Sequence, residues 1–218
     1  MKFSANMQPF LALGALLLWC VALLGFRLHR ASDGLAIGLL WNLFLATVPL
    51  GFGLTFEWAA ARKSSWASGV SFFLWLLFLP NAPYLLTDLV HLAPRENVPL
   101  WFVLALLLSC GATGALLGYF SLLRVQGVVE RKFGAPIGWT MALSALMLCG
   151  FGIYLGRFLR WNSWDAFTDP RGLLRSILAQ FSDARVHPNP LAITIVFGIG
   201  LILGYLALRA LTNSSRAA

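Results

Sequence analysis

Six long apolar segments follow one another along this chain, and together they leave few folds open to it. They cover about residues 9–26, 35–56, 66–80, 98–123, 136–159 and 191–208. A helix needs about 20 mostly apolar residues to cross the hydrocarbon core of a bilayer. Only helices and closed barrels satisfy their backbone hydrogen bonds there, and these continuous runs lack the alternation of barrel strands. The sequence predicts an all-α, polytopic transmembrane bundle that forms a single domain over residues 1–218.

The composition supports a membrane protein. Hydrophobic residues make up 59% of the chain and charged residues 11%, whereas soluble domains carry about 25% charged residues. The formal net charge is +8. The basic residues lie between the apolar segments, which favours membrane orientation and contact with anionic headgroups over nucleic-acid binding. Cys20, Cys110 and Cys149 lie within apolar segments without metal-ligand spacing and are expected to pack as small apolar side chains.

The distribution of basic residues bears on orientation. With six spans, the side that holds both termini carries eight Lys and Arg residues against two acidic ones, and the other side carries eight against six. The positive-inside rule counts Lys and Arg, so the two sides tie. If Arg157 and Arg160 serve a site, the count becomes eight against six. That count predicts that both termini lie in the cytoplasm. The first segment is expected to be retained as an anchor, because no small-residue cleavage site follows it.

The third apolar segment runs into FLPNAPYLLTDLVHL, residues 78–92. Proline suits the first turn of a helix and disrupts its interior. A break is therefore expected at Pro80–Pro83, followed by a short helix over residues 83–92 with Asn81 as its N-cap. One face of that helix would carry four polar residues at i, i+3, i+4 and i+7, which are Tyr84, Thr87, Asp88 and His91.

A second polar stretch, GIYLGRFLRWNSWD, closes the fifth apolar segment at residues 152–165 and is predicted to emerge on the same side. A charge in a membrane costs about 2.5–3.5 kcal/mol on insertion scales, so such groups are usually paired. Asp88 is therefore expected to contact Arg157 or Arg160. The same arginines can bind a phosphate or carboxylate through two parallel hydrogen bonds, and His91 can serve as an acid or base near neutral pH.

These two stretches define a candidate site. The proposed catalytic residues are Asp88, His91, Arg157 and Arg160, and the supporting residues are Asn81, Tyr84, Thr87, Trp161, Asn162 and Asp165. No cofactor motif is present, and the cofactor is left unassigned. Asp88 and His91 offer two metal ligands on one helical turn, but no second such pair exists, so no metal site is expected. The alternative interpretation is that an Arg–Asp pair and interfacial tryptophans only lock the helices together.

Two further patterns indicate packing and surface structure. GALLG at residues 114–118 is typical of a small-residue helix contact, and Asn42 is expected to hydrogen bond between helices. DPRGLLRSILAQF at residues 169–181 predicts an interfacial helix before the last span, capped by Asp169 and opened by Pro170. Arg171 and Arg175 are placed to meet lipid headgroups. The apolar stripe of this helix consists of Leu173, Leu174, Ile177, Leu178 and Phe181.

The stretches FLPNAPYLLTDLVHL and LGRFLRWNSWD resemble the bacterial membrane-protein family catalogued as domain of unknown function 1361, over roughly Trp41 to Phe197. The resemblance implies a bacterial multi-pass helical protein and no particular activity. We expect such a protein in the bacterial inner membrane. From the residues, one hypothesis is an enzyme or binding protein for an anionic lipid or lipid-linked substrate. A second is a non-catalytic subunit or assembly factor. A third is a transporter, although the break lies near one membrane surface and no repeated half is visible.

Overall fold

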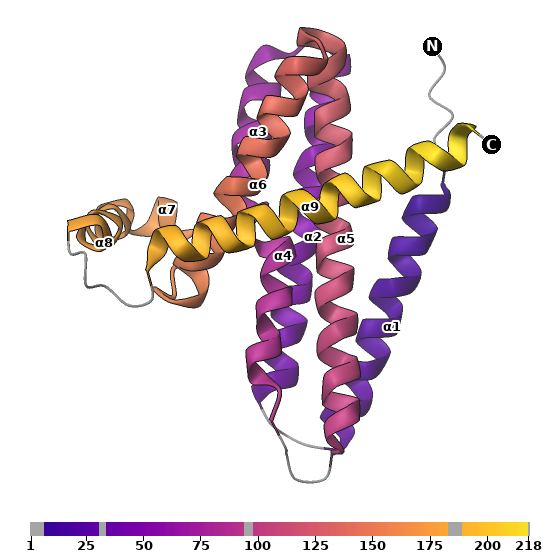
Figure 1. Ribbon diagram of the computed structural model, residues 1–218, viewed down its shortest axis with the longest axis vertical. Helices are drawn as coiled ribbons and strands as arrows, with labels where there is room; N and C mark the ends of the chain where they lie inside the picture. Colours follow the sequence, from indigo (N-terminus) through magenta and orange to yellow (C-terminus); the bar gives the residue numbers. More distant parts are fainter. Residues whose placement is uncertain (1–6, 31–33, 94–97, 183–188, 218) are drawn as a thin grey trace.

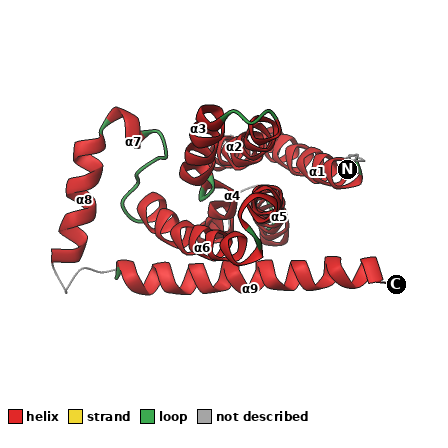
Figure 2. Cartoon of the chain, turned by 90° about the horizontal axis from the view of Figure 1, so that it is seen from above, coloured by secondary structure: helices red, strands yellow, loops and turns green. Residues whose placement is uncertain are grey.

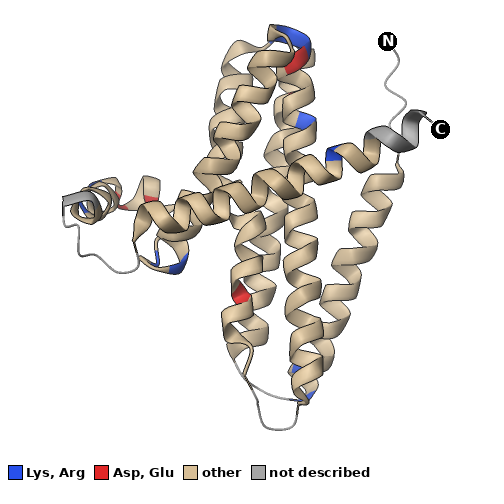
Figure 3. Ribbon diagram, viewed as in Figure 1, with Lys and Arg blue, Asp and Glu red and all other residues tan. Residues whose placement is uncertain are grey.

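The computed structural model describes residues 7–30, 34–93, 98–182 and 189–217. In this part of the chain six helical segments are long and apolar enough to cross a membrane, which confirms the expected multi-pass helical fold (Figure 1). Most of the helical ribbon carries no charged residue (Figure 3). The elements are α1 (Gln8–Arg30), α2 (Gly34–Ala61), α3 (Ser65–Phe78), α4 (Asn81–Tyr84), the 3-10 helix η1 (Leu85–His91), α5 (Leu100–Phe133), α6 (Ala135–Arg157), α7 (Asp165–Thr168), α8 (Pro170–Ser182) and α9 (Pro190–Ala217).

Helix α5 is the centre of the bundle. It packs against α1, α2, α4, η1 and α6, as the view from above shows (Figure 2). Small residues let these neighbours come close: a Cβ at Gly114 would overlap the carbonyl oxygen of Ala82, and one at Gly118 would lie 3.1 Å from the Ala82 Cβ. The predicted packing role of GALLG is thereby confirmed, and its partner is the break in the third span.

The third span breaks where the prolines predict, but it resumes differently. Helix α3 ends at Phe78. The short α-helix α4 and the 3-10 helix η1 then follow, instead of one regular helix over residues 83–92. Pro80 occupies the N-cap position of α4, so the predicted N-cap role of Asn81 is wrong. The Asn81 side-chain amide instead donates to the Phe78 carbonyl at 3.0 Å. It thus satisfies a carbonyl that α3 leaves without an intrahelical partner.

Helix α9 crosses the other helices obliquely and runs along α6 (Figure 1). A chain of polar contacts attaches it to α5. The Tyr205 hydroxyl donates to Gln126 Oε1, and Gln126 Nε2 donates to Glu130 Oε1 at 2.8 Å. Arg209 Nη1 lies 3.8 Å from the same carboxylate. Side-chain hydrogen bonds of this kind hold membrane helices together because apolar contact alone does not distinguish a helix from lipid.

The expected surface helix is present as α8 and lies to one side of the bundle (Figure 2). Asp169 Oδ1 accepts a hydrogen bond from the Gly172 N–H at 2.9 Å, which confirms the predicted cap. Leu174 and Leu178 are exposed while Leu173 and Ile177 are half-buried. The Phe181 side chain lies outside the described residues. An amphipathic helix with exposed leucines suits the membrane interface.

Cysteine labelling can test the topology. In a protein whose native cysteines are replaced by alanine, single cysteines at Arg62 and Arg131 are expected to react with a membrane-impermeant maleimide from one side. Cysteines at Arg30 and Arg160 are expected to react from the other side, because α2 crosses the membrane between Arg30 and Arg62 and α6 crosses it between Arg131 and Arg160. Labelling of Arg131 and Arg160 from the same side would contradict six spans.

Candidate functional site

The site is built around an ion pair between two spans. Arg157 is the last residue of α6 and Asp88 lies on η1. Arg157 Nη2 donates to Asp88 Oδ1, and the Asp88 side chain is only 4% exposed while that of Arg157 is 16% exposed. The predicted contact between Asp88 and one of the two arginines is confirmed for Arg157. Each charge offsets the cost of burying the other.

Three further side chains surround the same guanidinium. Arg157 Nε and Nη2 donate to Thr87 Oγ1 at 2.9 and 2.6 Å, and Nη1 lies 3.2 Å from His91 Nε2. The guanidinium carbon lies 4.5 Å from the centre of the Tyr84 ring, in cation–π range. All four polar residues expected on one face after the break therefore contact Arg157.

Glycine residues on α6 allow this close approach. A Cβ at Gly156 would lie 3.0 Å from Tyr84 Cε2, and one at Gly152 would lie 2.5 Å from Pro80 Cγ. The break in the third span therefore sits between glycine faces of α5 and α6. This packing brings Asp88 and Arg157 into contact although they are 69 positions apart in the chain.

Asn42 extends the network to the second span. Its Nδ2 donates to Asp88 Oδ2 at 3.1 Å, so both oxygens of the carboxylate accept hydrogen bonds. This confirms the interhelical role expected for Asn42, which the predicted site residues did not include. Among the described residues no third His, Cys, Asp or Glu joins Asp88 and His91 to form a metal-binding group.

Arg160 does not join the cluster. The fifth span, expected over about residues 136–159, corresponds to α6, which ends at Arg157. Beyond it the Trp161 N–H turns back to the Leu155 carbonyl at 3.0 Å. Arg160 has a positive φ of 60° and is exposed. It makes no hydrogen bond or ion pair with another described residue. Arg157 is therefore engaged within the bundle, whereas Arg160 is available at its surface.

The loop after α6 is attached to the end of α3. Asn81 Nδ2 donates to Ser163 Oγ at 2.9 Å, and Ser163 Oγ donates to the Leu77 carbonyl at 3.1 Å. Asp165 Oδ2 accepts from the Asn162 backbone N–H at 2.7 Å and from its side chain at 3.2 Å. Asn162 and Asp165 thus shape the loop. Sequence reasoning missed Ser163, since nothing in a lone serine signals a partner on another span.

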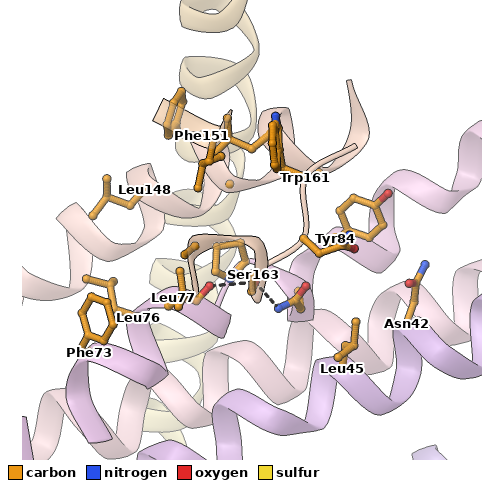
Figure 4. Close-up of a pocket in the computed structure, with 18 residues that line it drawn as sticks. Asn42, Leu45, Phe73, Leu76, Leu77, Tyr84, Leu148, Phe151, Trp161 and Ser163 are labelled. Atoms are coloured by element: carbon orange, nitrogen blue, oxygen red, sulfur yellow. Dashed lines mark hydrogen bonds between the residues drawn. The ribbon is translucent and has the colours of Figure 1, made fainter. Parts of the chain in front are cut away.

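Two recesses flank the network. The first has a volume of about 310 Å³ and lies between α2, α3, α4, α6 and the loop after α6. Phe73, Leu76 and Leu148 lie at one end of it, and Asn42 and Tyr84 at the other (Figure 4). Trp161, Asn162 and Ser163 form the loop wall. One end of the recess suits an apolar chain and the other a polar group.

The second recess is more polar. Its volume is about 300 Å³, and Gly34, Gly38, Asn42, Asp88 and His91 are among its lining residues. The His91 side chain is 44% exposed, so its imidazole is accessible from this recess while Asp88 stays buried. Asn42 lines both recesses, which places the Asp88 carboxylate close to each of them.

Comparison with known proteins yields one informative result. The model of the family described as "Protein of unknown function (DUF1361)" matches residues 41–204. Curated proteins and solved structures gave no match. The family match covers both polar stretches and every span from within α2 to within α9. The chain is therefore a member of the DUF1361 family.

Proposed function

We propose that this protein binds an amphipathic anion, a lipid or a lipid-linked phosphate or carboxylate, in the recess beside α6. The observation that supports this most directly is the division of the recess into an apolar and a polar end (Figure 4). Leu77, Phe151 and Leu155 add to its apolar wall, and Asn81 and Ser163 to its polar wall. Such a cavity matches a ligand with a hydrocarbon tail and a polar head.

The two arginines have separate tasks in this proposal. Arg157 is held by Asp88 and Thr87, and its charge is balanced by the carboxylate. It positions η1 against α6. Arg160 is exposed and directly precedes Trp161, which lines the recess. Its guanidinium is therefore the group that contacts the anionic head, with two parallel hydrogen bonds to a phosphate or carboxylate.

The backbone conformation of Arg160 supports its assignment as the residue that contacts the anionic head. A non-glycine residue with positive φ costs on the order of 1 kcal/mol, and such positions are enriched at functional sites. The φ of 60° turns the chain sharply after α6 and keeps Arg160 out of the Arg157 cluster.

Under this proposal the protein resides in the bacterial inner membrane, with both termini in the cytoplasm and the site on the opposite face.

A specific observation favours a second candidate. Every contact of Arg157 described above lies within the protein, so the cluster also fits a structural lock between spans. The protein would then be a non-catalytic membrane subunit or assembly factor. Ligand binding at the recess distinguishes this candidate from the first.

The test uses farnesyl phosphate, which combines an apolar chain with a phosphate, and the full chain purified in detergent. We expect it to bind the wild-type protein. Arg160→Lys is expected to lower its affinity about tenfold, since lysine keeps the charge but loses the planar pair of donors. Arg175→Lys, an exposed arginine on α8, should change the affinity by less than about twofold because surface charges contribute little. Isothermal titration or native mass spectrometry measures both.

His91→Gln tests which of the two recesses holds the ligand. Glutamine keeps the hydrogen-bonding capacity of the side chain. We expect farnesyl phosphate affinity to stay within about twofold, because His91 lines the neighbouring recess and does not line the apolar one. The proposed function would be wrong if farnesyl phosphate did not bind the wild-type protein, or if Arg160→Lys and Arg175→Lys had equal effects. The structural lock between spans would then be the remaining candidate.

A further inference from the structure

A third recess, lined mostly by basic residues, lies at the other end of the bundle from Arg157. It is enclosed by the turn between α2 and α3 and by the last turns of α5, and its volume is about 720 Å³. Basic residues are visible at this end, where α5 meets α6 (Figure 3). Four basic residues line the recess against one acid, Glu57. The basic residues are Lys63, Arg124, Arg131 and Lys132.

The carboxylates nearby are already engaged. Glu57 Oε2 lies 2.5 Å from Arg124 Nη2, and Glu130 accepts from Gln126 and lies near Arg209. The lining therefore keeps an excess of positive charge. In addition, the Nε atom of Arg124 is buried and has no hydrogen-bond acceptor among the described residues. A buried donor of this kind is costly unless a ligand or water accepts from it.

Lys63 is held toward the recess by an unusual backbone. The N–H groups of Lys63 and Ser64 bond to the carbonyls of Ala60 and Ala59 at 3.0 and 3.1 Å, which is the Schellman pattern at the end of α2. Its left-handed position is usually glycine, yet here it is lysine with φ 57°. A residue other than glycine is strained in this conformation, and such strain is a reason to look for function.

The remaining lining suits a phosphate carried on an apolar group. Ser64 and Ser65 line the recess, and their hydroxyl groups make no hydrogen bond with another described residue. Leu54, Trp58 and Val128 form the apolar part of the wall. Cationic side chains beside hydroxyl donors are the usual partners of phosphate oxygens.

We propose that this recess is a second binding site, specific for a phosphate group, on the membrane face opposite the Arg157 cluster. The phosphate can belong to an anionic lipid headgroup or to a soluble compound, since both present the same oxygens to Lys63, Arg124 and the serines. This site is separate from the recess beside α6 and does not depend on the function proposed there.

The experiment compares two neighbouring cations in the full chain. Lys63→Gly removes the charge and also relieves the positive φ, so the variant is expected to melt at the same or a higher temperature. Arg62→Gln removes a charge one residue away that stacks on Trp58 at 4.2 Å and does not line the recess. Lys132→Gln is a second lining variant, at an exposed position near the end of α5.

Binding is measured by native mass spectrometry with phosphatidylglycerol and, separately, with inorganic pyrophosphate. We expect Lys63→Gly and Lys132→Gln to lower affinity about tenfold, the value of a lost charge-assisted hydrogen bond, and Arg62→Gln by less than about twofold. Binding of phosphatidylglycerol alone identifies a lipid headgroup, and binding of pyrophosphate with the same dependence on Lys63 identifies a soluble phosphate. Three results would overturn the proposal. They are an equal loss of affinity in all three variants, unchanged affinity in both lining variants, and no binding of either probe.

Discussion

Replacing Asp88 with leucine is expected to lower the free energy of unfolding by about 3–5 kcal/mol. The carboxylate accepts from Arg157 on α6 and from Asn42 on α2, and it is buried. Its removal leaves the Arg157 guanidinium without a counter-charge inside a membrane protein, where an uncompensated charge is expensive. Thermal unfolding in detergent, followed by tryptophan fluorescence, measures the loss.

The matched control removes both charges. The double variant Asp88→Leu/Arg157→Leu is expected to recover much of the lost stability, because a buried ion pair replaced by apolar side chains is often neutral. A double variant as unstable as Asp88→Leu alone would contradict the assignment of Arg157 as the counter-charge. In that case the lost stability would come from Asp88 and its bond to Asn42 instead.

Replacing Gly114 with alanine is expected to destabilise the protein by about 1–3 kcal/mol, the usual cost of overpacking. The new methyl group would meet the carbonyl oxygen of Ala82, and a backbone atom cannot move aside as the end of a side chain can. Helix α5 and the break in the third span would be forced apart. Thermal unfolding measures the effect, and farnesyl phosphate binding reports whether the nearby recess survives.

Gly51→Ala is the control for this variant. Gly51 lies in α2, and a Cβ there would meet nothing within 4 Å. Alanine is the better helix former by about 1 kcal/mol, so this variant should be as stable as the wild-type protein or slightly more stable. If both alanine variants behave alike, Gly114 is not a contact residue and the packing of α5 against α4 is wrong.

Much of the fold follows from the sequence because each span meets the lipid separately. The apolar length of a segment is enough to predict a helix across the membrane, and six such helices are present. Pro80 and Pro83 predict a break by removing backbone donors. The high cost of a lone charge near the membrane predicts that Asp88 has a basic partner. These are properties of single segments and need no knowledge of their neighbours.

The tertiary structure alone decided which arginine meets Asp88. Arg157 and Arg160 are indistinguishable by residue type, and the choice depends on where α6 ends and on the positive φ of Arg160. Likewise, the Asn81 side chain does not cap the helix that follows it but donates to the last carbonyl of α3 and to Ser163, 82 positions away. The oblique path of α9 depends on its contacts with α5 and α6. The apolar composition of each segment determined which segments cross the membrane. The packing of distant segments determined which polar groups meet. A hydrogen bond or ion pair needs two groups at a suitable distance and angle, and no single segment contains both.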